Sequence, residues 1–151
     1  MGQLITKKGL EKIKRELNDR KTRLRKEIAE AIKEAKEQGD LSENAEYSEA
    51  KRQQNENESR IAKLEEMIKN SQVVKRDKSA NSVQLDSTIK VKSGRNKMEF
   101  HIVGSSEADP INFKISNESP LGKAFIGKSK GDKVEVETPR GKVKYEILEV
   151  V

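Results

Sequence analysis

Apolar residues in the first half of the chain recur three, four or seven positions apart, in two separate segments. The first stripe comprises Leu10, Ile13, Leu17, Leu24, Ile28, Ile32 and Ala35. The second comprises Tyr47, Ala50, Gln54, Asn57, Ile61, Leu64 and Ile68. Such narrow stripes are typical of paired helices. Folding the chain near residue 41 brings them face to face, with Ile13 opposite Ile68 and Ala35 opposite Tyr47. The pattern predicts an antiparallel helical hairpin.

Helix-boundary signals agree with this hairpin. Thr6 is a suitable N-cap for the first helix, and Gly39 is placed to end it. About 29 residues in each arm would reach roughly 43 Å at 1.5 Å per residue. The second stripe is polar in its middle, at Gln54 and Asn57, so the seam where the two stripes would meet is not optimised for stability there.

The period changes to two in the second half. Met98, Phe100 and Ile102 alternate with polar residues, and residues 133–150 form two alternating runs joined by a turn at 138–141. Ser119-Pro120 predicts the start of a short helix that Gly127 ends, and residues 76–81 and 104–112 are predicted as polar loops. We therefore expect an α+β protein with two domains. These are a coiled-coil arm at residues 1–75 and a small domain with an antiparallel sheet at residues 76–151.

Composition narrows the functional classes. Hydrophobic residues make up 32% and charged residues 38% of the chain, which leaves no large globular core. The absence of cysteine excludes disulfides, a thiol nucleophile and zinc-finger spacing. His101, the one histidine, is interpreted as a surface or edge-strand residue. No apolar run reaches membrane-spanning length and the N-terminus lacks a signal-peptide profile, so we expect a soluble, cytoplasmic protein without a membrane partner.

The net charge is weak evidence about function. The value of +6 at pH 7 permits a nucleic-acid or acidic partner. The two predicted domains share the excess equally, and neither contains a polybasic tail.

The segment from Gly39 to Tyr47 is the most informative part of the sequence. It places Asp40 and Glu43 at the predicted tip, far from any core. One interpretation is a capping box, with Asp40 as N-cap and Glu43 at N3. The other is that both carboxylates bind a hard cation such as Mg²⁺, which usually needs further oxygen ligands. The tip would then be half a metal site, useful only when inserted into another molecule's active centre.

Basic residues flank this tip. Lys36, Lys51 and Arg52 lie one to three helical turns behind the carboxylates, where an approaching phosphate chain would run. A second basic cluster, at residues 20–26, is interpreted chiefly as a solvated face with intrahelical ion pairs.

Motifs along essentially the whole chain resemble the bacterial Gre transcript-cleavage factors, GreA type. The tip segment is the most specific of them. The other matching segments are Thr6-x-x-Gly9-Leu10, Gln53-Gln54, Ile115-Ser116, Ser119-Pro120-Leu121-Gly122-Lys123-Ala124, Ile126-Gly127-Lys128, Gly131-Asp132, Thr138-Pro139-x-Gly141 and Tyr145-Glu146-Ile147-Leu148.

The resemblance implies a coiled-coil arm followed by an FKBP-like domain. It implies that the second domain docks at the secondary channel of RNA polymerase through Glu118, Ser119 and Pro120, and that the arm enters the channel. There Asp40 and Glu43 would help the polymerase hold its second catalytic Mg²⁺ while it hydrolyses the 3′ end of a backtracked nascent RNA. The factor would be a monomer without enzymatic activity of its own. Arg52 and Glu118 depart from the family's frequent acidic residue and aspartate, respectively.

Three alternatives stay open. The first is a Gre-like channel binder that inhibits polymerase without stimulating cleavage. The intact acidic pair argues against this alternative. The second is a prolyl isomerase, an activity of some FKBP-like folds, which needs an aromatic-lined pocket; only Phe100, Phe113, Phe125 and Tyr145 are available. The third is a general nucleic-acid-binding hairpin, which the even charge distribution makes less attractive.

Overall fold

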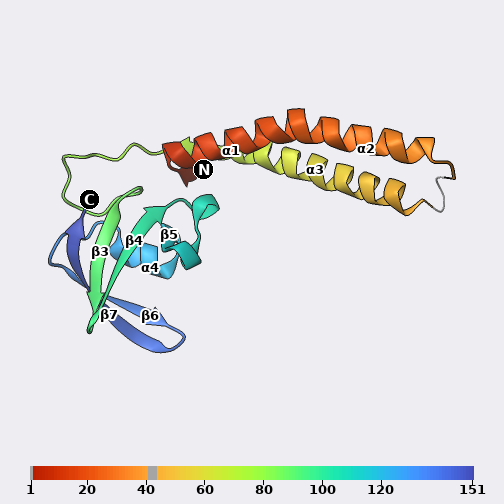
Figure 1. Cartoon of the computed structure of the whole chain (residues 1–151). Helices are drawn as coiled ribbons and strands as arrows, with labels where there is room; N and C mark the ends of the chain where they lie inside the picture. The colour runs from red at the N-terminus through yellow and green to blue at the C-terminus, as the bar shows by residue number, and fades with distance from the viewer. Residues whose placement is uncertain (1, 41–43) are drawn as a thin grey trace. The chain divides into compact units, whose positions relative to one another are not determined.

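A computed structural model describes residues 2–40 and 44–151 (Figure 1). The chain divides into two compact units. One is the helical arm, residues 10–70, and the other is the sheet unit, residues 1–9 together with 71–151. Within the described ranges no helix is long and apolar enough to cross a membrane.

The arm is built from helices that run in opposite directions (Figure 1). The elements in chain order are α1 (Lys7–Asp19), a π-helical turn (Arg20–Leu24), α2 (Arg25–Glu37) and α3 (Ala45–Asn70). The predicted cap of α1 is confirmed, because the Thr6 hydroxyl accepts a hydrogen bond from the Gly9 amide at 3.0 Å. The predicted α+β class and the antiparallel hairpin are also confirmed.

Every residue of the two predicted stripes is buried or half-buried. The seam, where the two helices pack together, therefore lies where the helical spacing of the apolar residues predicted it. Ion pairs cross between the helices beside this seam. Lys21 Nζ lies 2.9 Å from Glu65 Oε1, and the Arg25 guanidinium contacts both carboxylate oxygens of Glu58 at 2.8 Å. Such surface pairs contribute little stability each. The apolar stripe therefore provides most of the packing, and the charges border it.

The π-helical turn was not predicted. Apolar spacing does not reveal one extra residue in a turn, because the stripe continues on either side of it. The turn is accompanied by a buried polar residue of α3, Asn57, which is 3% exposed. Its side-chain Nδ2 donates to the carbonyl oxygen of Arg20 at 3.1 Å. The polar residue Asn57 in the predicted seam thus has a specific hydrogen-bond partner in the π-helical turn.

Acid is expected to loosen the arm through Glu16. Hydrogen bonds from Arg60 and then Arg20 lower the pKa of this carboxyl below its ordinary value of 4.5, although burial opposes the shift. The ionised carboxylate therefore stabilises the folded arm above that value, and the contribution is lost as pH falls through the lower folded pKa. Thermal melts between about pH 5 and 3 should show a steeper loss of stability for the native chain than for Glu16→Gln. Equal slopes would contradict the assignment.

The sheet unit contains a five-stranded sheet in the order β5-β4-β3-β7-β6. Its strands are β3 (Thr88–Ser93), β4 (Asn96–Val103), β5 (Lys114–Ser116), β6 (Lys133–Thr138) and β7 (Gly141–Val150). The predicted hairpin is confirmed, with Thr138 paired to Gly141 across its turn. The prediction of an antiparallel sheet needs one correction, because β4 and β5 pair in parallel. The chain between them contains two 3-10 turns, where a plain loop was predicted.

The structure also contains a two-stranded sheet that was not predicted from the sequence. β1 (Gln3–Ile5) pairs in parallel with β2 (Ser71–Val73), segments too short for a period to show. The start of α1 is hydrogen-bonded to another segment of the sheet unit, because the Thr6 amide donates to Glu107 Oε2 at 3.0 Å. The Thr6 hydroxyl bonds the other oxygen of the same carboxylate. The first helical turn therefore belongs to the sheet unit.

The core of the sheet unit lies between the sheet and a short helix, α4 (Pro120–Phe125). Ser119 caps this helix by accepting from the Gly122 amide at 3.0 Å, and Pro120 occupies its first position, as predicted. A Cβ on Gly122 would lie 1.9 Å from the carbonyl oxygen of Ser116, so only glycine allows this approach. The helix is thereby held tightly beside β5.

Candidate functional site

The distal end of the arm is closed by backbone turns and one asparagine. α2 ends at Glu37, and Gly39 adopts a φ of +113°, which favours glycine and confirms its predicted role. The Gln38 amide donates to the carbonyl of Ala35 at 3.3 Å. The chain thus leaves α2 abruptly, immediately before Asp40.

Asn44, which sequence reasoning overlooked, caps α3. Its Oδ1 accepts from the amides of Glu46 at 3.0 Å and Tyr47 at 3.1 Å. Its Nδ2 donates to the carbonyl oxygen of Ala35 at 2.8 Å, joining the two helices behind the tip. Asparagine is among the best N-caps, so its position before a helix-forming run was the available signal. The interpretation of Asp40 as N-cap of the second helix therefore does not hold for α3.

The acidic pair is only partly described. Asp40 is exposed at the end of the arm, as its predicted role requires, while Glu43 lies outside the described residues. Among the described residues no group of three histidine, cysteine, aspartate or glutamate side chains converges as a metal site. An exposed carboxylate is the oxygen donor that Mg²⁺ prefers. The donor chemistry thus fits a shared magnesium site, and the ligand role of the pair stays a prediction.

The three predicted phosphate contacts differ in their surroundings. Lys36 is exposed and forms no ion pair with any described residue. Lys51 donates to Gln54 Oε1 at 2.9 Å. Arg52 is held by Glu49 and Glu56, and the Glu49 hydrogen bonds are the main cause that raises its pKa. Arg52 would have to leave these carboxylates to bind a phosphate.

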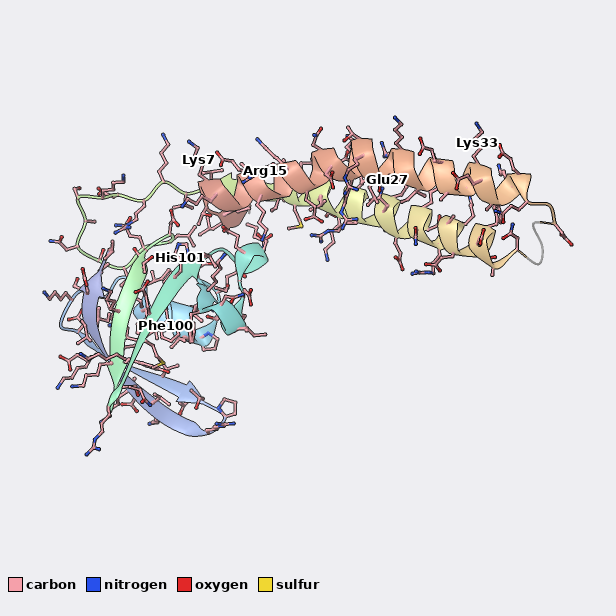
Figure 2. The ribbon with its side chains drawn as sticks, viewed as in Figure 1. Lys7, Arg15, Glu27, Lys33, Phe100 and His101 are labelled. Carbon is pink, nitrogen blue, oxygen red and sulfur yellow. The ribbon has the colours of Figure 1, made fainter. Side chains whose placement is uncertain are left out.

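The proximal basic cluster forms ion pairs of two kinds: the i,i+4 pairs that were interpreted from the sequence, and pairs between helices that were not. Arg23 bonds both Asp19 and Glu27, while Lys21 and Arg25 pair across to α3. Charged side chains, including the labelled Glu27 and Lys33, extend outward along the arm (Figure 2). Residues 10–70 carry 15 lysines and arginines and 15 aspartates and glutamates. With the units as the structure divides them, the net charge of +6 belongs to the sheet unit.

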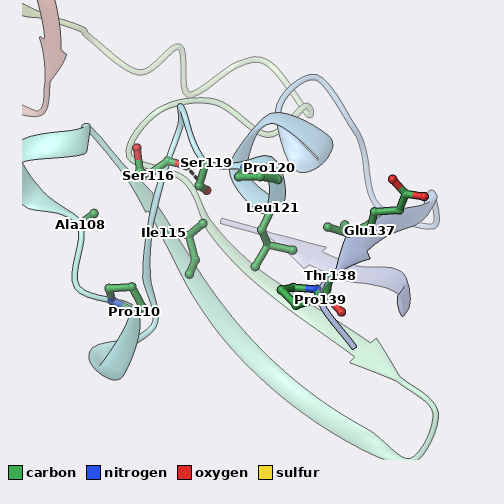
Figure 3. A pocket seen from close by; sticks show the side chains of 11 residues that line it. Ala108, Pro110, Ile115, Ser116, Ser119, Pro120, Leu121, Glu137, Thr138 and Pro139 are labelled. Carbon is green, nitrogen blue, oxygen red and sulfur yellow. Dashed lines mark hydrogen bonds between the residues drawn. The ribbon is translucent and has the colours of Figure 1, made fainter. Parts of the chain in front are cut away.

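The predicted docking residues lie at an apolar pocket of about 410 Å³. Ser119 and Pro120 line it, whereas the neighbouring Glu118 is exposed and bonds Ser116 Oγ through its backbone amide at 3.1 Å. Figure 3 shows Leu121 and Pro139 on its wall. All three prolines of the chain contribute to this wall. Their rigid rings give an apolar surface that changes shape little when a partner binds.

The aromatic side chains of the sheet unit do not line that pocket. Phe100 packs against Phe125 and Tyr145, with ring centroids 6.0 Å and 6.3 Å apart. The pocket wall contains no aromatic residue, so the geometry gives the prolyl-isomerase alternative no support.

His101 was predicted to be a surface or edge-strand residue. It belongs to β4, which has neighbours on both sides, so the edge-strand part of that prediction is wrong. The side chain is half-buried, and its Nε2 lies 2.8 Å from Asp86 Oδ1.

Comparison with known proteins covers nearly the whole chain. Residues 3–73 match the family model described as transcription elongation factor, N-terminal. Residues 78–151 match transcription elongation factor, GreA/GreB, C-term.

The chain is also similar to individual proteins. Transcription elongation factor GreA of Thermoanaerobacter pseudethanolicus is 50% identical over 150 residues, covering 97% of this chain and 96% of the relative. The protein of the same name from Clostridium acetobutylicum is 51% identical, with 97% and 95% covered. GreA factor homolog 1 of Thermus thermophilus, a solved structure, is 25% identical with a TM-score of 0.45, over 100% of this chain and 99% of that one. The two family models and the near-full-length relatives show that the chain belongs to the GreA/GreB family of transcription elongation factors.

Proposed function

We propose that this elongation factor stimulates RNA polymerase to cleave the 3′ end of a backtracked transcript. The protein would act as a cytoplasmic monomer that enters the polymerase's secondary channel, and the polymerase would perform the hydrolysis. The observation that carries the proposal is the exposed Asp40 at the end of a slender arm, where Asn44 rather than Asp40 caps the next helix.

The arm provides reach. α3 contains 26 residues, which corresponds to roughly 39 Å at 1.5 Å per residue. Small buried residues, Ala35 and Ala50, occupy its distal seam and keep that end narrow. A narrow two-helix arm of this length suits a channel better than it suits a compact core.

Asp40 and Glu43 would supply oxygen ligands to a Mg²⁺ ion that the polymerase also holds. When bound, that ion activates water and stabilises charge on the cleaved phosphodiester. The contribution of this chain is to present the carboxylates at a fixed place. Lys36, and Lys51 once released from Gln54, would contact the phosphates of the RNA 3′ end.

The sheet unit would provide docking. An apolar pocket with the exposed Glu118 beside it suits an apolar side chain next to a basic residue of the polymerase. The net charge of +6 on this unit would otherwise repel a basic partner, so Glu118 provides the local complement.

Addition of the full chain to a stalled, backtracked elongation complex with Mg²⁺ tests the proposal. Short 3′-terminal RNA fragments should appear, and the complex should resume elongation. Free RNA with the protein alone should stay intact, because the described part of the chain holds no complete metal site. Undiminished arrest in the presence of the protein would contradict the proposal and favour the inhibitor alternative.

Reversing the charge of Glu118 should weaken docking. We expect Glu118→Lys to raise the protein concentration needed for half-maximal cleavage by about tenfold, or roughly 1.4 kcal/mol, with little change in the maximal rate. The fold should be unaffected, because Glu118 contacts Ser116 through its backbone. Glu99→Lys, an exposed reversal on β4, is the matched control. Equal effects of the two variants would show that Glu118 has no special role.

A further inference from the structure

The middle of the arm is a place where the helical geometry changes. The π-helical turn Arg20–Leu24 joins α1 to α2 and contains one residue more than an α-helical turn would. Each residue rotates a helix by about 100°. The extra residue therefore sets which face of α2 meets α3, and so whether Ile28 and Ala35 lie in the seam, where both are buried.

Asn57 of α3 bonds this turn with both ends of its side-chain amide. Nδ2 donates to the carbonyl oxygen of Arg20 at 3.1 Å, and Oδ1 accepts from Arg20 Nη1 at 3.2 Å. The same carbonyl also accepts the backbone amide of Arg25, the wide-turn hydrogen bond of the π-helix. Asn57 is 3% exposed, so any other alignment of the helices would bury its amide without these partners.

Glu16 extends the contact into α1. One carboxylate oxygen, Oε1, accepts from Arg20 Nε at 2.9 Å and from Arg60 Nε at 2.8 Å. The other accepts from Arg60 Nη2 at 3.1 Å. Glu16, Arg20, Asn57 and Arg60 thus link α1, the π-helical turn and α3. We name these four residues the mid-arm polar cluster.

The rest of the seam specifies alignment weakly. Apart from Tyr47 and the half-buried Gln54, it consists of aliphatic and alanine side chains, among them Ile61 and Leu64, which pack acceptably in more than one register. A buried polar residue in such a seam fixes the register while lowering stability relative to an apolar one. Displacement of one helix by a turn would move its end by about 5.4 Å. Catalytic geometry tolerates displacements of only about 1 Å.

We propose that the mid-arm polar cluster positions the tip. It sets the rotation and register of the two helices, so that Asp40 is presented at the correct place in the polymerase active centre. The four residues are positioning residues and touch neither RNA nor metal. This inference rests on the proposed function, while its structural part, control of register, is independent of that function.

The test is Asn57→Leu, which replaces the buried amide with a typical seam residue. We expect thermal stability to be unchanged or higher, because an apolar side chain suits the seam. The maximal cleavage rate at saturating protein should fall about tenfold to hundredfold. The half-saturating concentration should change less than about threefold, because docking belongs to the sheet unit.

Gln54→Leu is the matched control. Gln54 is also a half-buried amide in the α3 seam, but its Oε1 accepts a hydrogen bond from Lys51 of the same helix, and among the described residues no hydrogen bond joins it to the π-helical turn. This variant should not lower the maximal rate, because Lys51 would leave Gln54 in any case when it contacts the RNA phosphates. An equal loss of rate in both variants would overturn the proposal, since polarity anywhere in the seam would then suffice.

Register is read directly by spin-label distances. The chain contains no cysteine, so nitroxides placed at Ala31→Cys and Asn55→Cys, both exposed, report the α2–α3 alignment alone. Asn57→Leu should shift this distance or add a second population. An unchanged single distance would overturn the proposal, whatever the cleavage rate.

The two proposals can fail separately. If the native protein stimulates no cleavage but the distance shifts in Asn57→Leu, the proposed function fails and control of register stands. Asn57→Ala provides the same comparison if the leucine variant loses its helical circular dichroism.

Discussion

Asp40→Asn should abolish stimulation of transcript cleavage while leaving the protein folded. The change removes an anionic oxygen donor and preserves side-chain size. Loss of a metal ligand should exceed the roughly 10–100-fold cost typical of outer-shell partners. Helix stability should not change, because Asn44 provides the α3 cap. The variant should still dock and therefore compete with the native protein as an inhibitor.

Asp19→Asn is the matched control for this prediction. It makes the same chemical change on the arm, removes an ion pair with Arg23 and lies far from the tip in sequence. It should retain near-native cleavage. Near-native cleavage by Asp40→Asn as well, with unchanged circular dichroism and equal competition, would show that Asp40 is not a ligand.

Gly122→Ala should destabilise the sheet unit strongly. The added methyl would lie 1.9 Å from the Ser116 carbonyl oxygen and 3.1 Å from Asn117 Cα, both backbone atoms that cannot turn aside. Overpacking of this kind costs about 1–3 kcal/mol, and the short α4 has little capacity to shift. Chemical denaturation followed by tyrosine fluorescence should detect it, since Tyr145 packs against Phe125 of this helix at 5.5 Å.

Lys123→Ala tests whether the effect is steric. It introduces the same residue at the next, exposed position of α4 and should leave stability nearly unchanged. Wild-type stability of Gly122→Ala would mean that the helix can move away from β5. The apolar pocket, which Pro120 and Leu121 help to line, would then also be adjustable.

The sequence predicts the arm well because a helical seam is a local, periodic signal. Stripe residues such as Ile28 and Leu64 are buried where the period placed them. The π-helical turn could not be predicted, since the hydrogen bonds that accompany it join Arg20 and Asn57, 37 positions apart. The polar gap at Asn57 was visible, but its partner was not.

The tip of the arm shows a second limit of prediction from the sequence. Asp40 and Asn44 are both good caps by type, and the choice between them depends on where α3 starts. The structure starts it at Ala45, which the residue preferences alone did not determine. In the sheet unit the parallel pairings of β1 with β2 and of β4 with β5 were also missed. Three-residue strands carry too little alternation, and their partners are distant in the chain or follow irregular turns.

The magnesium dependence of cleavage tests the central claim most directly. In a backtracked elongation complex, the Mg²⁺ concentration for half-maximal cleavage should fall when the native protein is added, because the proposed role of its carboxylates is to add ligands to the shared ion. Asp40→Asn at saturating concentration should return that value towards the one measured without the factor. Identical half-maximal Mg²⁺ concentrations for the native and Asp40→Asn proteins would contradict the claim that the arm tip supplies part of the metal site.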